Sequence, residues 1–223
     1  MNIFMNNFSI LITAGPTYEK IDPVRFIGNY SSGKMGIALA HECLIRGIHV
    51  ELVLGPVTID SDVFNHPNIH VTHVESAQDM YEACMDIYPK MNAAILCAAV
   101  ADFTPEKVAD KKIKRKGDEL IIRLKPTKDI AAALGKKKND NQLLVGFALE
   151  TNDEETNAQD KMKRKKFDFI VLNSLNDKGA GFRHDTNKIT IISQNHKTEY
   201  PLKDKSACAV DIIDELMKLL KTC

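Results

Sequence analysis

The sequence contains no tryptophan and five cysteines among 223 residues, and it lacks any long apolar run. The cysteines are odd in number and show neither CxxC nor zinc-finger spacing, which argues against a disulfide framework and a structural zinc site. No apolar stretch reaches the roughly 18 residues that a membrane-spanning helix requires. The opening residues, MNIFMNNFS, lack a basic segment followed by an apolar one, so we expect no signal peptide and a cytoplasmic protein.

An excess of either charge is also absent, because 30 basic residues balance 30 acidic ones. We therefore expect no general affinity for nucleic acid or for an anionic membrane. Hydrophobic residues make up 44% of the chain and charged residues 27%, as in ordinary globular proteins. This composition and length predict a single domain over residues 1–223 with a sizeable core.

Short apolar runs alternate with segments of helical periodicity along most of the chain. The runs predict strands, the last antiparallel at an edge, over residues 9–14, 49–54, 69–74, 93–100, 143–149, 169–172 and 188–193. Helices are predicted over residues 33–46, 76–88, 127–138, 152–166 and 204–220. Ser31 or Ser32, Ser76 and Thr127 are the candidate caps of the first three helices. The alternation predicts an α/β fold with a Rossmann-like, doubly wound, mostly parallel sheet.

A highly charged segment interrupts this alternation. Residues 111–116 and 119–125 alternate charged with apolar side chains around a central Gly-Asp pair, a pattern typical of a β-hairpin. We expect an inserted β-hairpin flap over about residues 107–125. Lys112 and Lys114 would share one face of its first strand, and a mobile arm with two ammonium groups could cover a polyphosphate.

The stretch DPVRFIGNYSSGKMG, residues 22–36, combines turn residues, three glycines and a predicted helix start. Backbone N–H groups at a helix start, with glycine permitting close approach, suit a phosphate or carboxylate. An ordinary surface loop with a helix cap explains the same residues equally well. The residues alone leave both interpretations open.

Two motifs in this stretch fit incompletely. Residues 28–34, GNYSSGK, match the start of the P-loop pattern GxxxxGK[ST], but Met35 replaces the metal-binding hydroxyl and the match lies far beyond the first strand. Tyr30 and Lys34 match the YxxxK pair of short-chain dehydrogenases, yet the chain contains no GxGxxG. An NAD(P)-dependent reductase is therefore the weaker alternative.

The carboxyl ends of parallel strands are where an open α/β sheet binds its ligands. At the carboxyl end of the fourth predicted strand, Ala98, Ala99 and Ala101 would let a base or ribose approach the backbone. Asp102 would accept from ribose hydroxyls, help to hold a metal, or simply cap the next turn.

Basic residues cluster on the predicted flap and on the charged helix at 152–166. Lys161 and Lys165 lie one turn apart on that helix and can reach one anion. Together with the flap lysines they suggest a nucleoside triphosphate site, with residues 29–36 as the seat of a second anionic substrate.

Four segments, in this order and spacing, resemble phosphopantothenoylcysteine synthetase: TAGPTYEKIDPVRFIGNYSSGKMG, CAAVADF, KKIK and VGFALETN. The resemblance covers about residues 9–220. The SSGKMG form is similar to the bacterial enzymes that use CTP, whereas the animal enzymes prefer ATP. In most bacteria this unit is the C-terminal half of a fusion with a flavin-dependent decarboxylase, which is therefore a possible partner.

The resemblance implies a ligase of coenzyme A biosynthesis that acts as a homodimer. CTP, with Mg²⁺ as cofactor held mainly by the triphosphate, would activate 4′-phosphopantothenate as an acyl-cytidylate. L-Cysteine would then attack this intermediate to give 4′-phosphopantothenoyl-L-cysteine, CMP and pyrophosphate. Neutralising the phosphate charge is the physical need, since one anion must attack another.

Site residues follow from the same resemblance. Asn29 would bind the acyl intermediate and assist its reaction with cysteine, and Lys112 would be required to form the acyl-cytidylate. The turn at 127–130, often Asn-Pro-Asp-Ile in this family, here reads TKDI. Nucleotide contacts are implied at Ala98, Ala99, Asp102, Lys112, Lys114, Thr127, Lys128, Asp129, Ile130, Phe147, Lys161 and Lys165, and acyl-substrate contacts at Arg25, Asn29, Ser31, Ser32, Gly33 and Lys34.

Overall fold

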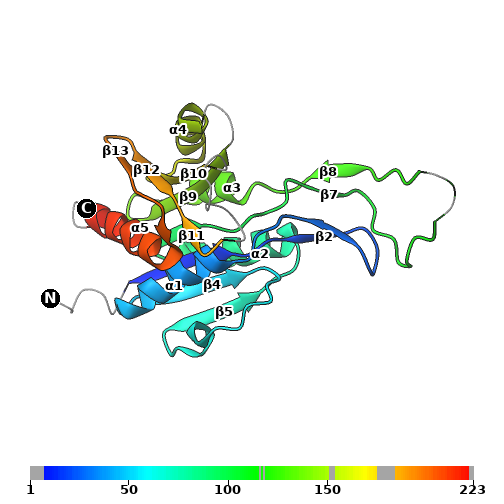
Figure 1. The fold of residues 1–223 in the computed structure, drawn as a ribbon, viewed down its shortest axis with the longest axis horizontal. Coiled ribbons are helices and arrows are strands. Elements are labelled where there is room, and N and C mark those ends of the chain that lie inside the picture. The colour runs from blue at the N-terminus through cyan, green and yellow to red at the C-terminus, as the bar shows by residue number, and fades with distance from the viewer. Residues whose placement is uncertain (1–7, 116, 118, 151–153, 175–183, 221–223) are drawn as a thin grey trace.

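The structure is a computed structural model that describes residues 8–115, 117, 119–150, 154–174 and 184–220. An eight-stranded sheet forms its centre (Figure 1). The first six strands in its spatial order are parallel and the last two are antiparallel. That order is β5 (Ile69–His73), β4 (His49–Leu54), β1 (Ser9–Ala14), β6 (Ala93–Leu96), β9 (Leu143–Glu150), β10 (Phe169–Ser174), β12 (Ile189–Ser193) and β13 (Lys197–Glu199).

Helices cover both faces of this sheet, as a doubly wound fold requires. One face carries α1 (Lys34–Ile45) and α5 (Lys205–Leu220), and the other carries α2 (Ala77–Ile87), α3 (Ile130–Lys137) and α4 (Glu154–Lys165). Two short 3₁₀ helices, η1 (Asp62–Asn65) and η2 (Tyr88–Lys90), and a ladder of β11 (Thr186–Asn187) with β14 (Lys203–Asp204) complete the connections. The predicted Rossmann-like fold is confirmed. No helix within the described residues is long and apolar enough to cross a membrane.

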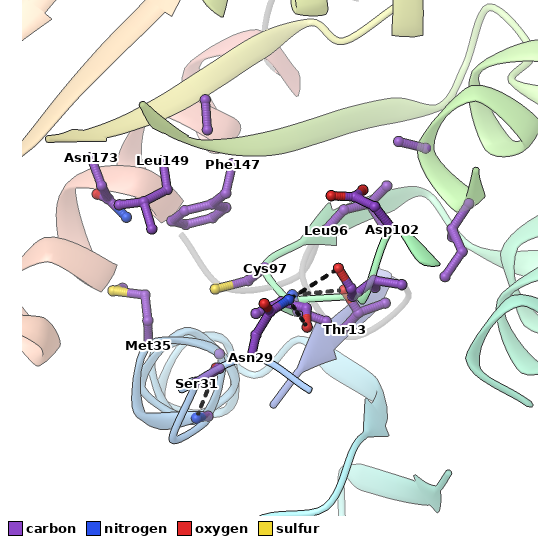
Figure 2. Close-up of a pocket in the computed structure, with 18 of the residues that line it drawn as sticks. Thr13, Asn29, Ser31, Met35, Leu96, Cys97, Asp102, Phe147, Leu149 and Asn173 are labelled. Carbon is purple, nitrogen blue, oxygen red and sulfur yellow. Dashed lines mark hydrogen bonds between the residues drawn. The ribbon is translucent and has the colours of Figure 1, made fainter. Parts of the chain in front are cut away.

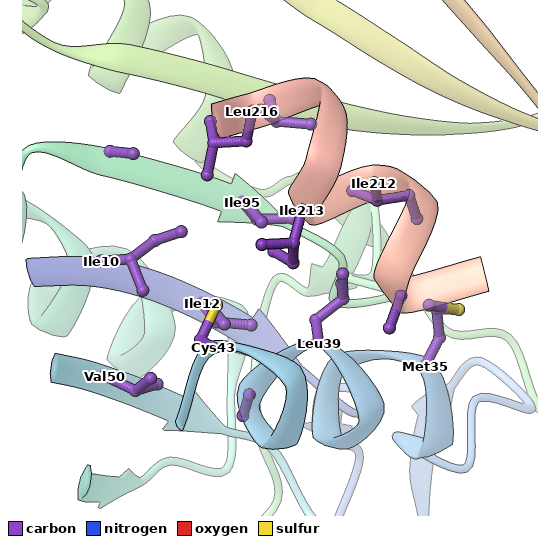
Figure 3. Packing of buried hydrophobic residues seen from close by; sticks show 14 of the residues in the cluster. Ile10, Ile12, Met35, Leu39, Cys43, Val50, Ile95, Ile212, Ile213 and Leu216 are labelled. Atoms are coloured by element: carbon purple, nitrogen blue, oxygen red, sulfur yellow. The ribbon is translucent and has the colours of Figure 1, made fainter. Parts of the chain in front are cut away.

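Alternation along β1 divides the core into two layers. Ile10 and Ile12 point to the α1 and α5 face, where they pack with Leu39, Ile212 and other fully buried side chains (Figure 3). Leu11 points to the opposite face and packs in the cluster that includes α2, α3 and α4. A strand buried on both faces must be apolar throughout, which is why this run was recognisable in the sequence.

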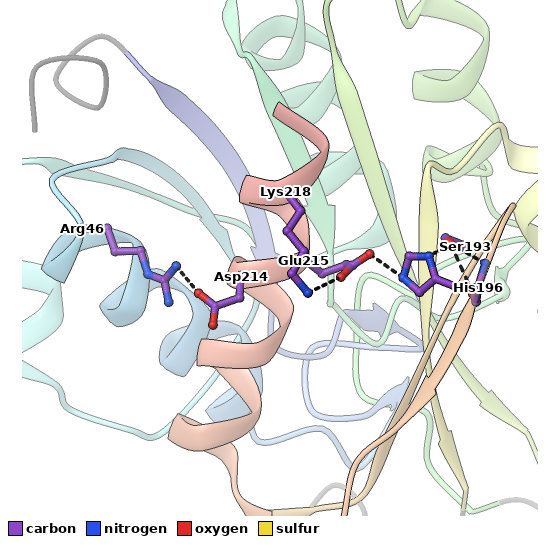
Figure 4. Close-up of polar contacts among 6 residues, drawn as sticks. All are labelled: Arg46, Ser193, His196, Asp214, Glu215 and Lys218. Carbon is purple, nitrogen blue, oxygen red and sulfur yellow. Dashed lines mark hydrogen bonds and ion pairs between the residues drawn. The ribbon is translucent and has the colours of Figure 1, made fainter. Parts of the chain in front are cut away.

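Helix α5 is also held by charged contacts on two sides (Figure 4). The buried Glu215 carboxylate accepts from His196 Nε2 at 2.7 Å and from Lys218 Nζ at 3.2 Å. His196 lies in the turn between β12 and β13, so this contact ties the antiparallel edge of the sheet to the helix. On the other side, Arg46 after α1 donates to Asp214 at 2.6 Å.

Several predicted boundaries are wrong in detail. The strand predicted over residues 93–100 ends at Leu96, because the chain leaves the sheet there. The strand predicted at the sheet edge, β12, is covered by β13. Ser76 caps α2 as predicted, with a capping box.

Two of the predicted helix caps are also wrong. Gly33, with φ of 79°, is the N-cap of α1, and neither Ser31 nor Ser32 caps it with a side chain. Asp129 rather than Thr127 caps α3.

The predicted flap is a projecting arm whose strand pairing differs from the prediction. Its ladder forms only at the base, between β7 (Phe103–Pro105) and β8 (Leu124–Pro126). The described residues between these strands, which we call the arm (residues 106–123), contain no strand. Lys112 and Lys114 therefore do not lie on a paired strand. Figure 1 shows the arm extending well away from the sheet.

A second projection was missed altogether. The connection after β1, which the sequence presents as a long loop, contains a hairpin of β2 (Tyr18–Lys20) and β3 (Phe26–Gly28). This β2–β3 hairpin contacts β7 and lies beside the base of the arm (Figure 1). The rings of Tyr18 and Phe26 stack across it with centroids 3.7 Å apart.

Gly36 allows α1 to lie directly against β1. A Cβ atom at this position would lie 2.4 Å from the Ala14 Cβ atom and 3.1 Å from the Ala14 Cα atom, so an added methyl group cannot be accommodated without moving the helix. The contact sets the position of the first turn of α1 relative to the carboxyl end of β1.

We predict that Gly36→Ala lowers the free energy of unfolding by about 1–3 kcal/mol, the usual cost of overpacking a tight contact. Urea denaturation followed by circular dichroism measures this change. His41→Ala, on the exposed face of the same helix, is the control and should alter stability by less than about 0.5 kcal/mol. Equal stability of Gly36→Ala and the unmodified chain would contradict the close contact.

Candidate active site

A cavity of about 580 Å³ opens at the carboxyl ends of β1, β6, β9 and β10. The strand order reverses there, since the chain runs from β1 outward to β4 and β5 and then returns to β6 beside β1. Where the strand order of an open α/β sheet reverses, the loops that follow the two neighbouring strands diverge and leave a crevice. The volume is within the range of small-molecule sites.

Segments that are far apart in the chain line this cavity together (Figure 2). Most of the residues that the sequence implicated are among them, from both the nucleotide set and the acyl set. They are Asn29, Ser31, Ser32, Gly33, Lys34, Ala98, Ala99, Asp102, Thr127, Lys128, Asp129, Ile130, Phe147, Lys161 and Lys165.

Asn29 lies on the wall formed by the β2–β3 hairpin and the start of α1 (Figure 2). Its Nδ2 atom donates to the carbonyl oxygens of Ala99 at 3.1 Å and Val100 at 3.2 Å. An amide group carries two N–H donors and one oxygen acceptor. Because both carbonyl contacts use Nδ2, the Asn29 Oδ1 atom is the group that can accept from a ligand.

Three hydrogen bonds hold the segment after β6 to the end of β1 and to the loop that follows it. The backbone N–H of Ala98 donates to Thr13 Oγ1 at 3.2 Å, and that of Ala101 donates to Thr17 Oγ1 at 3.0 Å. Between them, Ala99 N donates to Gly15 O at 2.9 Å. Small side chains and a fixed backbone leave this wall open to a flat group.

The opposite wall is cationic. Lys161 Nζ donates to the carbonyl oxygen of Phe147 at 2.9 Å, which places the lysine of α4 at the end of β9. Lys165, one turn further, forms an ion pair with Asp129 at the start of α3. Burial opposes ionisation of Asp129, but hydrogen bonds from Lys165 and the Ala132 N–H outweigh it and lower the pKa of the carboxyl. Two lysines of α4 thus line this wall, and the Asp129 carboxylate pairs with one of them.

Residues 5–220 match the model of the DNA/pantothenate metabolism flavoprotein C-terminal domain. The chain belongs to this family. The membership confirms the family resemblance found in the four sequence segments, three of which line the cavity in part.

Two relatives are similar to this chain over nearly all of its length. A protein from an unknown prokaryotic organism, named cysteine/cysteine sulfinic acid decarboxylase, is 55% identical over 97% of this chain and 60% of its own length. The coenzyme A biosynthesis bifunctional protein CoaBC of Bacillus subtilis (strain 168) is 44% identical over 95% of this chain and 52% of its own length. The chain thus spans little more than half of these relatives.

One solved structure matches this chain over nearly its whole length. The crystal structure of the C-terminal domain of a CoaBC protein is 38% identical, with a TM-score of 0.82, and the match covers 98% of each chain. The likeness thus covers nearly the whole of both chains.

The structure adds one cavity residue, Lys205, that no sequence pattern indicated. Lys205 begins α5, is 7% exposed, and donates to the His184 carbonyl oxygen. Burial lowers the pKa of Lys205, and the nearby Lys34 ammonium lowers it further. Lys34 itself pairs with Asp185. Only the packing of α5 beside α1 brings these segments together, so no local signal could have identified them.

Three of the predicted site residues do not line the cavity in the described chain. Lys112 and Lys114 are exposed on the arm. Arg25 lies at the far end of the β2–β3 hairpin, where its guanidinium contacts Asp22 and the carbonyl oxygen of Ile113. Their roles at the ligand stay predictions.

Cys97 lines the cavity beside the catalytic candidates, yet its thiol is not activated. Burial raises the pKa of the Cys97 thiol to about 12, and the positive charge of Lys205 opposes this only in part. Burial likewise raises the pKa values of Cys43 and Cys84 to about 12 and that of Cys208 to about 11. Since the thiolate is the nucleophile, these four groups should be unreactive at neutral pH.

We predict that iodoacetamide at pH 7.5 alkylates Cys97 at least about 100-fold more slowly in the folded protein than in the urea-unfolded protein, because the folded thiol carries far less thiolate. Peptide mapping by mass spectrometry measures the rate for each cysteine. Equal rates for Cys97 in the two states would show that this thiol is ionised in the cavity.

Proposed function

We propose that this chain is a phosphopantothenate–cysteine ligase that uses CTP. The observation that carries the proposal is one cavity in which Asn29 and the start of α1 face the lysines of α4. An anionic acyl substrate on the first wall and a triphosphate on the second would meet between them. Identity of 44% to a coenzyme A biosynthesis bifunctional protein, over 95% of this chain, supports the same assignment.

The first step forms the acyl-cytidylate. A carboxylate oxygen of 4′-phosphopantothenate attacks the α-phosphorus of CTP, the bond from that phosphorus to the bridging oxygen breaks, and pyrophosphate leaves with the electron pair. Lys161 and Lys165 reduce the charge repulsion between the two anions. Lys112 and Lys114 contribute further positive charge when an arm, from this chain or from a second copy, covers the cavity.

The second step forms the amide. The neutral amine of L-cysteine attacks the acyl carbon, the bond from that carbon to the phosphate oxygen breaks, and CMP leaves while the amine proton passes to solvent. The Ala99 and Val100 carbonyl groups hold the Asn29 amide so that Oδ1 accepts from the attacking amine and aligns it. Ser31, Ser32, Gly33 and Lys34 bind the acyl substrate at the start of α1.

Mg²⁺ is the cofactor that this chemistry requires. Within the described residues, no cluster of three His, Cys, Asp or Glu side chains could hold a metal ion by itself. Magnesium is commonly bound by one or two carboxylates together with substrate phosphates. Asp102 lines the cavity and is exposed, so this carboxylate and the triphosphate fit a magnesium site. The bound ion would supply further neutralisation of phosphate charge.

The alternative of an NAD(P)-dependent reductase remains the weaker proposal. Dinucleotide sites place a tight glycine turn between the first strand and the first helix. Here residues 15–33, with the β2–β3 hairpin, occupy that connection. The base, ribose and phosphate groups of a dinucleotide would thus meet Asn29 instead of a glycine turn.

A homodimer is the assembly that best explains the apolar surface of the two projections. Large exposed hydrophobic side chains gather on the β2–β3 hairpin, the arm and their flanking residues: Val24, Phe26, Tyr30, Phe103, Val108, Leu120, Ile121 and Leu124. Exposed apolar side chains concentrated on two neighbouring projections are typical of an interaction site. A second copy seated there would cover these side chains and bring its own arm lysines close to a cavity.

The relatives that extend beyond this chain suggest a further partner. CoaBC of Bacillus subtilis is named bifunctional, and this chain matches 52% of it. A flavin-dependent phosphopantothenoylcysteine decarboxylase, which would consume the product of the ligase, is the activity that we assign to the remaining half.

We predict that Lys112→Gln reduces pyrophosphate release from CTP by about 100-fold or more, because it removes a charge needed in the transition state. Asn29→Asp should release pyrophosphate, accumulate the acyl-cytidylate and fail to form the amide. Phosphate-coupled assays and mass spectrometry distinguish the two outcomes. ATP should substitute poorly for CTP, and EDTA should stop both steps.

Lys136→Gln removes an exposed lysine at the end of α3 and is the control, with turnover expected at the unmodified level. Wild-type turnover in both Lys112→Gln and Asn29→Asp would contradict the site assignment. Thermal stabilisation by NADPH but not by CTP and Mg²⁺ would favour the reductase.

We predict that the double substitution Val24→Asp and Ile121→Asp converts the protein to a monomer, because two charges per copy would be buried in the proposed interface. Light scattering after size-exclusion chromatography measures the mass. Ile45→Asp is the control, since Ile45 is exposed on α1 away from the two projections. A monomer before substitution would contradict the homodimer.

A further inference from the structure

Asp22 is a buried carboxylate at the turn of the β2–β3 hairpin, and it accepts hydrogen bonds from two directions. Its Oδ1 atom accepts from the backbone N–H groups of Val24 and Arg25, both at 2.9 Å, which closes the hairpin turn. Its Oδ2 atom accepts from Arg25 Nε at 3.0 Å and from the backbone N–H of Ile113 at 3.0 Å. One oxygen thus serves the hairpin and the other serves the arm.

Arg25 completes the contact with the arm. Its guanidinium donates to Asp22 Oδ2 and also to the carbonyl oxygen of Ile113 at 2.9 Å. Both backbone polar groups of Ile113 are therefore held by one acid–base pair that lies about 90 residues earlier in the chain. The Ala109 N–H donates to Ile21 O at 3.0 Å, which attaches the same segment of the arm to the β2–β3 hairpin at a second point.

The anchored residue lies between the two arm lysines. Lys112 and Lys114 are exposed, whereas Ile113 is half-buried against the hairpin. Consecutive Cα atoms are about 3.8 Å apart, so holding the Ile113 backbone fixes where both lysine side chains begin. The remaining length of the arm has no such restraint among the described hydrogen bonds.

The opposite end of the same hairpin carries Asn29. β3 ends at Gly28, and the next residue, Asn29, reaches the cavity wall through the Ala99 and Val100 carbonyl groups. The stacked Tyr18 and Phe26 rings lie between the two ends. The β2–β3 hairpin is therefore a short physical link between the arm and the acyl wall of the cavity.

The charge of this link persists at neutral pH. The hydrogen bond from the Arg25 side chain lowers the pKa of Asp22 well below its ordinary value, although burial opposes this. A carboxyl with a lowered folded-state pKa stabilises the fold above its unfolded pKa and loses that effect only as pH falls toward the lower value. Asp22 is thus an anion wherever the ligase reaction would be assayed.

We infer that Asp22 is a positioning residue: through Arg25 and the Ile113 backbone it holds Lys112 and Lys114 at a set place relative to Asn29. The anchoring of the arm stands on the contacts alone. Its consequence for the rate rests on the proposed function, since it requires the arm lysines to act on the triphosphate.

Asp22→Asn separates the two roles of the carboxylate. The asparagine oxygen keeps the turn bonds to Val24 and Arg25, while its NH₂ group faces the Ile113 N–H and the guanidinium, where only donors remain. We expect backbone hydrogen exchange in residues 107–115 to quicken about tenfold or more, with exchange in α2 unchanged. Exchange followed by mass spectrometry requires no activity. Asp110→Asn, an exposed carboxylate on the arm, is the control and should leave exchange unaltered.

The kinetic test is a double-mutant cycle with Lys112→Gln. Asp22→Asn alone should slow pyrophosphate release about tenfold or more, as expected for a misplaced charged group. In the Lys112→Gln background, Asp22→Asn should cause a much smaller loss, since only Lys114 remains to be misplaced. A merely structural role would instead reduce both backgrounds equally.

Each outcome decides a separate statement. Unchanged exchange in Asp22→Asn overturns the anchoring, and quickened exchange with additive kinetic effects overturns the positioning role. An unmodified protein that releases no pyrophosphate from CTP overturns the proposed function, while the exchange measurement still decides whether Asp22 anchors the arm.

Discussion

The constraint on which this structure depends is the reversal of strand order between β1 and β6. Because the chain leaves β1 toward one edge of the sheet and returns beside it, the loops that follow the two strands diverge. The gap collects the start of α1, the segment after β6, the turn before α3 and the lysines of α4. No side chain in the cavity would meet the others without this reversal, and the tight contact of Gly36 with Ala14 sets how closely α1 approaches it.

The β2–β3 hairpin adds a second level of organisation. In an ordinary dinucleotide fold the first strand turns directly into the first helix. Here the inserted hairpin presents Asn29 to the cavity at one end and binds the arm through Asp22 and Arg25 at the other. The cavity wall at Asn29 and the arm lysines are therefore connected through covalent structure and an ion pair whose carboxylate is buried. This connection would keep the arm lysines at a fixed distance from Asn29 during the proposed two-step reaction.

Sequence reasoning succeeded where the signal is local and failed where pairing partners decide. β1 and β4 were predicted to the residue, since each is a short, mainly apolar run that a glycine–proline pair ends. Of the strands predicted over residues 111–116 and 119–125, only Leu124 and Lys125 lie in a strand among the described residues, because alternation of charge and apolarity indicates an extended chain but not what it pairs with. Asp129, not Thr127, caps α3, because the Thr127 hydroxyl donates to the carbonyl oxygen of Ala101.

The sequence alone determined the fold class, which follows from its periodicity, and the resemblance of four segments to a known family indicated the family and most of the predicted site residues that line the cavity. The tertiary structure decided the rest. Lys205 enters the cavity only because α5 packs beside α1, and Arg25 binds the arm only because two distant hairpins lie side by side. Contacts between segments about 90 or more residues apart depend on how layers pack, and no local pattern records that packing.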